Sequence, residues 1–204
     1  MDSLTQIVLG AAIGEAVLGR KIGNKAMLYG AISGTIPDLD VFASFFTDTV
    51  SALEIHRGFT HSVFFSLLFA PILAFIVTKY ETYKNFKNWT FLFFWVFITH
   101  PILDAQTTWG TQLFWPLDIR LAFKNIFVID PLYTLPFLVF LILAMRQKKA
   151  SKKRRFYNNL GLYISSLYLV LTVILKGVSY QKFTKELAEQ KISYKTIKTK
   201  PTPL

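Results

Sequence analysis

Long apolar stretches separated by short polar loops dominate the chain. Four of them reach the roughly 17 to 25 residues that cross a bilayer, once their aromatic and polar flanks are counted. These are residues 61–78, 89–105, 126–145 and 157–175. Two weaker stretches, 4–18 and 26–46, precede them and are rich in Gly and Ala, which favours close helix packing in lipid. The pattern predicts an all-α, polytopic helical membrane protein with about six membrane segments, the first two short or partly re-entrant.

Basic residues lie mainly in alternate loops between these segments. They are Arg20, Lys21 and Lys25 after the first segment, Lys79, Lys84 and Lys87 after the third, and residues 146–155 after the fifth. Short cytoplasmic loops carry the Lys and Arg of membrane proteins. Six spans therefore place both termini and the loops 47–60 and 106–125 on the extracytoplasmic side. The Lys-rich tail after Lys176 argues mildly against this orientation.

Composition agrees with a membrane protein and narrows the chemistry. Of the 204 residues, 52% are hydrophobic, which exceeds the usual share in a soluble domain. The chain has no Cys, so disulfides, thiolate metal sites and cysteine nucleophiles are excluded, and any metal must be held by nitrogen and oxygen. A net charge of +11 would indicate nucleic-acid binding in a soluble protein. Here the charges sit between apolar runs, so we expect no nucleic-acid partner.

The chain divides into a membrane part and a tail. Residues 1–175 are predicted to form one helical membrane domain, and residues 176–204 a C-terminal tail. Within the tail, 177–190 fits an amphipathic surface helix and 199–203 an extended segment, as if a further region began there. The first residues lack the basic start and cleavage pattern of a secretory signal, so we expect them to be retained.

The first polar motif is Pro37-Asp38-Leu39-Asp40, two carboxylates at the end of an apolar segment. An ionised group at membrane depth costs at least about 2.5 kcal/mol and normally faces a protein interior or a wet cavity. A helix-ending turn at the interface, where Pro and Asp are common, explains this motif equally well.

The second motif is His56-Arg57-Gly58-Phe59-Thr60-His61-Ser62, which leads into the segment 61–78. Two imidazoles at the entry of a membrane helix match neither an aromatic anchor nor an ordinary cap, although Thr60 or Ser62 can still cap the helix. The pair favours metal binding.

The third motif is His100-Pro101-Ile102-Leu103-Asp104, inside an apolar stretch. A His and an Asp four positions apart project from one face of a helix, so they can bind one ion together or form a carboxylate–histidine pair behind a ligand. A buried His–Asp hydrogen bond that only joins helices is the alternative.

Together the motifs are more informative than any one of them. All three histidines of the chain lie in these motifs, each beside carboxylates and each near the outer end of a predicted span. Neutral imidazole and carboxylate suit zinc, with manganese or iron as alternatives, and paired Asp residues could bridge two ions. Such an ion activates a bound water near neutral pH, which is the nucleophile that a hydrolase without Cys needs.

Other polar residues are weaker candidates. Glu15 could be a ligand, a general base or a helix–helix contact. Arg57 and Arg120 could hold a phosphate or carboxylate, or anchor lipid headgroups. The least specific candidates are Glu54, Asp118 and Asp130, and Asp130 most simply starts a helix before Pro131.

The three ordered motifs, with Thr107-Thr108-Trp109-Gly110 after them, resemble the YdjM-like family of bacterial inner-membrane, metal-dependent hydrolases over residues 1–175. The resemblance implies a multi-pass inner-membrane enzyme. Its implied metal ligands are Asp38, Asp40, His56, His61, His100 and Asp104. The groups expected nearest the reaction are Asp38, His61, Asp104 and Arg57. Longer relatives continue into a further C-terminal region.

We therefore expect a hydrolase that acts on a lipid ester or phosphoester near the outer leaflet, with membrane lipid as its environment. Lipid is inferred from location, because Trp109 and Trp115 flank a site at headgroup level. A divalent-metal transporter is one alternative, because histidines and aspartates in helices also mark ion pathways. A structural membrane protein whose metal only ties helices together is another.

Overall fold

The computed structural model describes residues 1–48 and 56–202, and helices are its regular structure throughout. The elements in chain order are α1 (Ser3–Ile22), α2 (Asn24–Thr35), the 3-10 helices η1 (Pro37–Phe45) and η2 (Phe59–His61), α4 (Val63–Tyr80), α5 (Phe86–Asp104), α6 (Pro131–Met145) and α7 (Lys152–Glu189). Within the described residues the β structure is limited to one isolated bridge, Thr111 to Leu121. The predicted all-α class is confirmed.

Short polar side chains fix where most of these helices begin. Each accepts a hydrogen bond from the backbone N–H three residues further on, which satisfies one of the free donors of a helix start. These capping residues are Asp2 for α1, Ser62 for α4, Asn85 for α5, Asp130 for α6 and Ser151 for α7. The cap at Ser62 matters for the site, because it fixes the residue next to His61.

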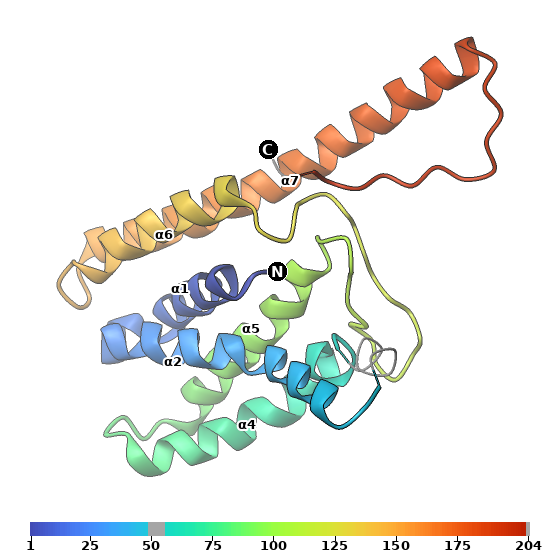
Figure 1. The fold of residues 1–204 in the computed structure, drawn as a ribbon. Coiled ribbons are helices and arrows are strands. Elements are labelled where there is room, and N and C mark those ends of the chain that lie inside the picture. Colours follow the sequence, from blue (N-terminus) through green and yellow to red (C-terminus); the bar gives the residue numbers. More distant parts are fainter. Residues whose placement is uncertain (49–55, 203–204) are drawn as a thin grey trace.

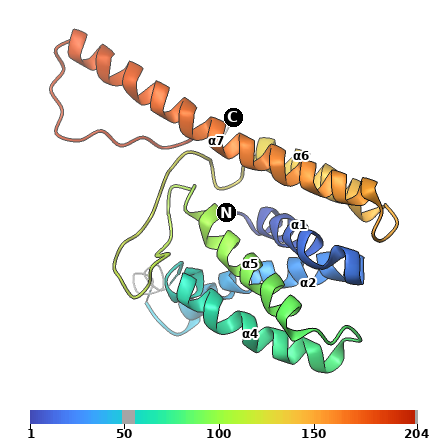
Figure 2. The same ribbon diagram turned by 180° about the vertical axis from the view of Figure 1, so that it is seen from behind.

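The helices form three antiparallel pairs, with the α1–α2 pair between the α4–α5 pair and the α6–α7 pair (Figure 1, Figure 2). Glycines allow α1 and α2 to approach very closely. A Cβ on Gly14 would lie 2.1 Å from the carbonyl oxygen of Ala26, and a Cβ on Gly30 would lie 2.1 Å from that of Gly10. Such backbone contact is the reason that small residues line helix interfaces in lipid.

Two hydrophobic clusters hold the pairs together. One lies between α1, α6 and α7 and includes Val8 and Phe137. The other lies between α4 and α5 and is rich in aromatic rings, with Phe65 and Phe97 in edge contact at 5.2 Å between centroids. This aromatic cluster lies beneath the end of α5 that carries His100.

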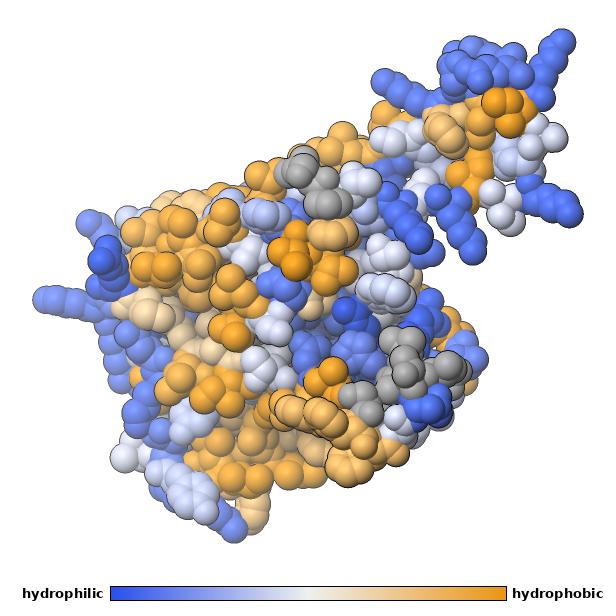
Figure 3. Space-filling view, in the orientation of Figure 1, coloured by the Kyte–Doolittle hydropathy of each residue, from blue (hydrophilic) through white to orange (hydrophobic). Residues whose placement is uncertain are grey.

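Helices α4 and α7 are long and apolar enough to cross a membrane, and α6 is a shorter apolar helix. All three expose large apolar side chains, including Leu67 (60%), Leu135 (56%) and Val170 (55%). Figure 3 shows broad hydrophobic areas over one face of the molecule. Such exposure is unusual for a soluble monomer and typical of contact with lipid.

The six predicted segments are not all confirmed as spans. The stretch 26–46 is divided at Ile36, where α2 gives way to η1. With 12 residues, α2 is about 18 Å long, which is shorter than the ~30 Å hydrocarbon core. The predicted tail helix 177–190 is helical through Glu189, but as a continuation of α7, which projects beyond the other helices in Figure 1.

Candidate metal centre

Four residues from three separate elements converge at one end of the bundle. Asp38 comes from η1, His61 from η2, and His100 and Asp104 from the last turns of α5. Each offers one ligand atom, and these four atoms all lie within 4.8 Å of one another. Imidazole nitrogen and carboxylate oxygen form a donor set suited to zinc and its first-row neighbours. The geometry could therefore hold a metal ion.

The two imidazoles face each other across this group. Nε2 of His61 lies 3.1 Å from Nε2 of His100, 3.3 Å from Oδ1 of Asp38 and 3.5 Å from Oδ2 of Asp104. Nε2 of His100 lies 3.4 Å from the same Asp38 oxygen. Oδ2 of Asp104 is buried and accepts no hydrogen bond from the described residues. A buried carboxylate oxygen without a hydrogen bond, beside two imidazole nitrogens, fits a cation.

Burial differs among the four. The side chains of His61 and Asp104 have no exposed surface and that of His100 has 1%, whereas that of Asp38 is 25% exposed. The group is thus closed toward the bundle and open only beside Asp38. Water or a substrate would reach it from that side.

The local sequence explains how each side chain reaches the group. His100 and Asp104 are four positions apart in α5, so one helix face carries both. Asp38 follows Pro37 in the first turn of η1. His61 is the last residue of η2, immediately before the cap of α4. The predicted one-face geometry of His100 and Asp104 is what the structure has.

A backbone carbonyl sets the orientation of His100. Its Nδ1 lies 2.8 Å from the carbonyl oxygen of Gly34, near the end of α2, where helix carbonyls lack partners within the helix. Since the carbonyl can only accept, Nδ1 carries the proton and the Nε2 lone pair is free. Metal-ligating histidines almost always have such a partner on their other nitrogen.

Asp40 orients the imidazole of His61 in a similar way. Nδ1 of His61 lies 3.3 Å from Oδ2 of Asp40 and 3.0 Å from the hydroxyl of Thr60. The same Asp40 oxygen accepts hydrogen bonds from Thr60 Oγ1 at 2.6 Å and from the backbone N–H of Arg57 at 3.1 Å. Its other oxygen lies 2.6 Å from Nδ1 of His56.

Asp40 and His56 lie beside the four-residue group. Both were expected among the ligands, but the structure leaves them outside the four-residue group, with the Asp40 oxygens already engaged by neighbours. This arrangement favours an orienting carboxylate behind His61 over a direct ligand. His56 contacts Oδ1 of Asp40, whereas His61 lies beside Oδ2, and the His56 side chain is 31% exposed.

Arg57 is turned inward. It has a positive φ of 65° and is only 6% exposed, so it is not placed to anchor lipid headgroups. Its Nε lies 3.4 Å from Oδ2 of Asp104, and Nη1 donates to Thr107 Oγ1 at 3.1 Å. It thus contacts a carboxylate of the site, and its predicted role in holding a phosphate or carboxylate stays a prediction. Arg120 is exposed in the loop before α6, and its role stays a prediction.

Two contacts to Asp104 were missed from the sequence. Gln6 of α1 is buried, and its Nε2 donates to Oδ1 of Asp104 at 3.0 Å and to the carbonyl of His100 at 3.3 Å. The amino group of Met1 contacts the same Asp104 oxygen. A polar Gln within an apolar stretch was the available signal for Gln6.

The weaker candidates lie elsewhere. Glu15 forms a helix–helix contact with Arg154 of α7, which was one of its predicted roles. Asp130 caps α6 as expected. Asp118 accepts a hydrogen bond from Gln112 at 3.0 Å in an exposed position. Glu54 lies outside the described residues.

The predicted basic loops meet at the other end of the bundle. Lys25 at the start of α2 contacts Glu81 at the end of α4 at 2.9 Å, and this hydrogen bond lowers the pKa of Glu81. Arg154 at the start of α7 donates to Asn24 at 2.7 Å. Gln6 and Arg20 are 14 positions apart in α1, so about 21 Å separate this end from the candidate metal centre.

Comparisons with known proteins agree with the motifs. The inner membrane protein YbcI of Escherichia coli K12 is 28% identical over 112 residues, which cover 55% of this chain and 64% of YbcI. The uncharacterized protein YfhP of Bacillus subtilis 168 is 29% identical over 144 residues, covering 64% of this chain and 42% of YfhP. The matches thus span less than two thirds of these relatives. No solved structure matches the chain. The family model described as YdjM inner membrane protein matches residues 1–180, and the chain therefore belongs to the YdjM family.

Proposed function

We propose that the protein is a multi-pass enzyme of the bacterial inner membrane, a metal-dependent hydrolase that uses Asp38, His61, His100 and Asp104 to hold a divalent ion, with zinc favoured by the donor types. The observation that carries the proposal is the approach of the two imidazole Nε2 atoms to 3.1 Å beside a buried oxygen of Asp104 that accepts no hydrogen bond from the described residues. Nitrogen and oxygen donors in this number match a single ion of the zinc type.

Each residue around the proposed ion has a role that follows from its position. A divalent ion bound there would lower the pKa of a bound water and so supply a nucleophile near neutral pH. Gly34 and Asp40 hold the imidazoles of His100 and His61 with their Nε2 atoms turned inward. Arg57 and Gln6 hold Asp104. Asp38, the exposed member, borders the opening through which a substrate would enter.

Location supports a lipid ester or phosphoester as the substrate. The candidate metal centre lies at the end of the bundle opposite the basic loops, and basic loops face the cytoplasm. This supports a position of the centre toward the outer leaflet. Trp109 (64% exposed) and Trp115 (38% exposed) lie in the loop that follows α5 on this side. Exposed Trp rings are typical of the headgroup region, where lipids are the most abundant ligands.

A metal site that only ties helices together is the second candidate, and burial favours it. Structural zinc sites have four protein ligands and no open position, whereas catalytic sites keep one for water. Three of the four side chains here have at most 1% exposed surface. The two candidates differ in whether Asp38 is a permanent ligand or yields its place to water.

Elemental analysis of the purified protein, followed by hydrolysis assays on a mixed bacterial lipid extract, tests the proposal. We expect about one divalent ion per chain in the wild type, none in His100→Ala, and lipid hydrolysis that is lost with the metal. Thr99→Ala is the matched control, because Thr99 precedes His100 on α5 but bonds only to its own helix. A wild type without stoichiometric metal would end the proposal. Metal without any hydrolysis would favour the helix-tying site.

A further inference from the structure

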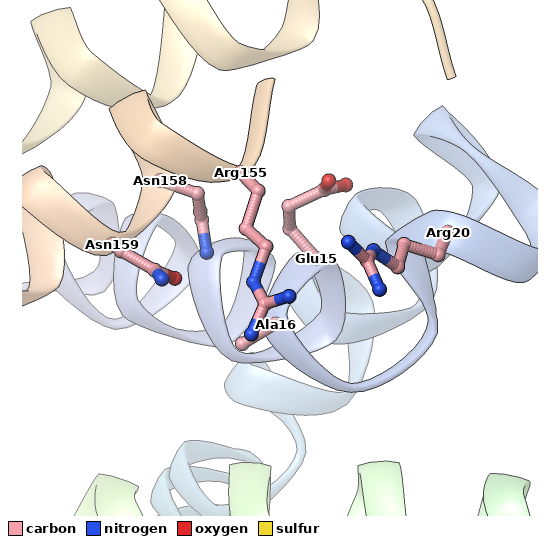
Figure 4. Close-up of a pocket in the computed structure, with 6 residues that line it drawn as sticks. All are labelled: Glu15, Ala16, Arg20, Arg155, Asn158 and Asn159. Carbon is pink, nitrogen blue, oxygen red and sulfur yellow. The ribbon is translucent and has the colours of Figure 1, made fainter. Parts of the chain in front are cut away.

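A polar cavity of about 260 Å³ opens between the end of α1 and the start of α7. Figure 4 shows its lining, which consists of Glu15, Ala16, Arg20, Arg155, Asn158 and Asn159. We propose that this cavity binds the phosphodiester headgroup of an anionic glycerophospholipid whose headgroup carries a hydroxyl, as in phosphatidylglycerol. The proposal is independent of the metal centre, which lies at the other end of α1.

The cavity carries an excess of positive charge. Glu15 is neutralised by Arg154, whose Nε and Nη2 donate to its two oxygens, both at 2.6 Å. The side chains of Arg20 and Arg155 have no counter-ion among the described residues, and both are exposed. Figure 4 shows the two guanidinium groups on the same side of Ala16, with Arg20 extending from α1 and Arg155 from α7. Paired guanidiniums bind phosphate oxygens through geometrically matched hydrogen bonds.

Asn158 provides a second and separate indication of a ligand. It is only 2% exposed, and its Nδ2 donates to the carbonyl of Ala12 at 3.0 Å. Its Oδ1 is buried but accepts no hydrogen bond within the described part of the chain. Buried acceptors without a donor are rare, because leaving one unpaired is costly. Asn158 lines the cavity, and an adjustment of its side chain would let a hydroxyl of the ligand headgroup supply the missing donor.

The surroundings suit a lipid better than a free phosphate ester. Basic pockets between helices on the cytoplasmic side of a membrane are typical sites for anionic headgroups. Phe156 (60% exposed) and Tyr163 (66% exposed) follow the cavity along α7. These rings offer an apolar surface to acyl chains once the headgroup is held. A soluble ester would make no use of that surface.

The test measures lipid binding to the full-length protein in detergent by native mass spectrometry. Phosphatidylglycerol, phosphatidylmethanol and phosphatidylcholine are titrated separately. Phosphatidylmethanol has the same charge as phosphatidylglycerol but lacks the headgroup hydroxyl. In the wild type we expect phosphatidylglycerol to bind about fivefold more tightly than phosphatidylmethanol, the effect of one hydrogen bond. Both should bind more tightly than phosphatidylcholine. Equal binding of all three lipids would overturn the proposal, and equal binding of the two anionic lipids would overturn the role of Asn158.

The variants separate the cavity from general electrostatic attraction. Arg20→Gln with Arg155→Gln should weaken phosphatidylglycerol binding at least about tenfold, because two charged hydrogen-bond donors are lost. The control is Lys152→Gln with Lys153→Gln, which removes the same charge from exposed positions at the start of the same helix. We expect the control to bind within about twofold of the wild type, because neither lysine lines the cavity and salt screens more distant charges. Equal losses in the two double variants would show nonspecific attraction and reject the cavity as the site.

Discussion

Nε2 of His61 lies 3.1 Å from Nε2 of His100, although 39 positions separate the two residues in the chain. Because Nδ1 of His100 donates to Gly34, its Nε2 has no proton in the neutral ring and presents a lone pair to His61. Two such nitrogens with Asp38 and Asp104 beside them make a site whose donors all point to one place. This relationship is the basis of the first three predictions.

Removal of the metal should destabilise the wild type. A ligand present at about 100 times its Kd stabilises the folded state by roughly 2.7 kcal/mol, so chelation should remove about that amount. The comparison is the melting temperature of the detergent-solubilised protein with and without a chelator, and after zinc is added back. His100→Ala should melt at the same temperature in all three conditions. An equal response of wild type and variant to the chelator would contradict metal binding at this site.

Asp40→Asn should weaken metal binding without abolishing it. Carboxylates that orient a ligating histidine typically contribute 10- to 100-fold to metal affinity, and Asp40 is placed to orient His61. Competition titration with a zinc indicator should show an affinity lower by about that factor and full occupancy at saturating zinc. Asp118→Asn is the control, because this carboxylate is exposed in the loop before α6. Loss of all binding in Asp40→Asn would instead make Asp40 a direct ligand, as the sequence predicted.

Metal affinity should fall as the pH falls. Bound imidazoles must be neutral, so protons compete with the ion for His61 and His100. Burial lowers the pKa of His61, but its contacts with Asp104 and Asp38 outweigh this effect and raise the pKa to about 10. An ion must therefore displace a proton from His61 across this range, so the affinity should fall by roughly tenfold per pH unit from pH 8 to pH 6. The same indicator titration at several pH values measures this directly. An affinity independent of pH across that range would argue that the imidazoles are not the ligands.

Several features of the centre could be predicted because they depend on local sequence. The pairing of His100 with Asp104 follows from helix geometry alone, and the helix that carries them is evident from its apolar residues. The start of α4 was signalled by Ser62 as a candidate cap. The order of the three motifs also led to the YdjM family.

Other features depend on tertiary contacts or on helix type. The sequence does not distinguish Asp38 from Asp40 as a ligand. The turn of η1 brings Asp38 into the four-residue group, and η1 is a 3-10 helix where an apolar α-helix was expected. Gln6 reaches Asp104 only because α1 packs against α5. A helix over 177–190 was predicted, but as a separate surface helix. No proline interrupts the chain before it, so α7 continues through Gly177 to Glu189 without a break.

Close packing of α1 against α2 should make Gly30→Ala strongly destabilising. The new Cβ would lie 2.1 Å from the carbonyl oxygen of Gly10, so the two backbones must move apart. Overpacking of this kind costs about 1–3 kcal/mol. Gly177→Ala is the matched control, because nothing lies within 4 Å of its added Cβ in α7. This change should be neutral or stabilising by up to about 1 kcal/mol. Equal thermal stability of the two variants would contradict the observed α1–α2 approach.

Breaking the buried ion pair of Glu15 and Arg154 should destabilise the protein more than replacing both partners by apolar residues. Both side chains are at most 5% exposed, and Arg154 also donates to Asn24. Glu15→Gln leaves a buried guanidinium without its carboxylate, which typically costs about 3–5 kcal/mol. Replacing both partners by apolar residues, Glu15→Leu with Arg154→Met, removes the unpaired charge, so much of that stability should return.

The exposed pair of Lys25 and Glu81 provides the control for this comparison. Lys25 is 58% exposed at its side chain, and solvent screens such a pair. Lys25→Gln should therefore change the free energy of unfolding by less than about 1 kcal/mol. Unfolding titrations of the four proteins in detergent measure the differences. Equal destabilisation by Glu15→Gln and Lys25→Gln would contradict a buried ion pair at Glu15 and Arg154.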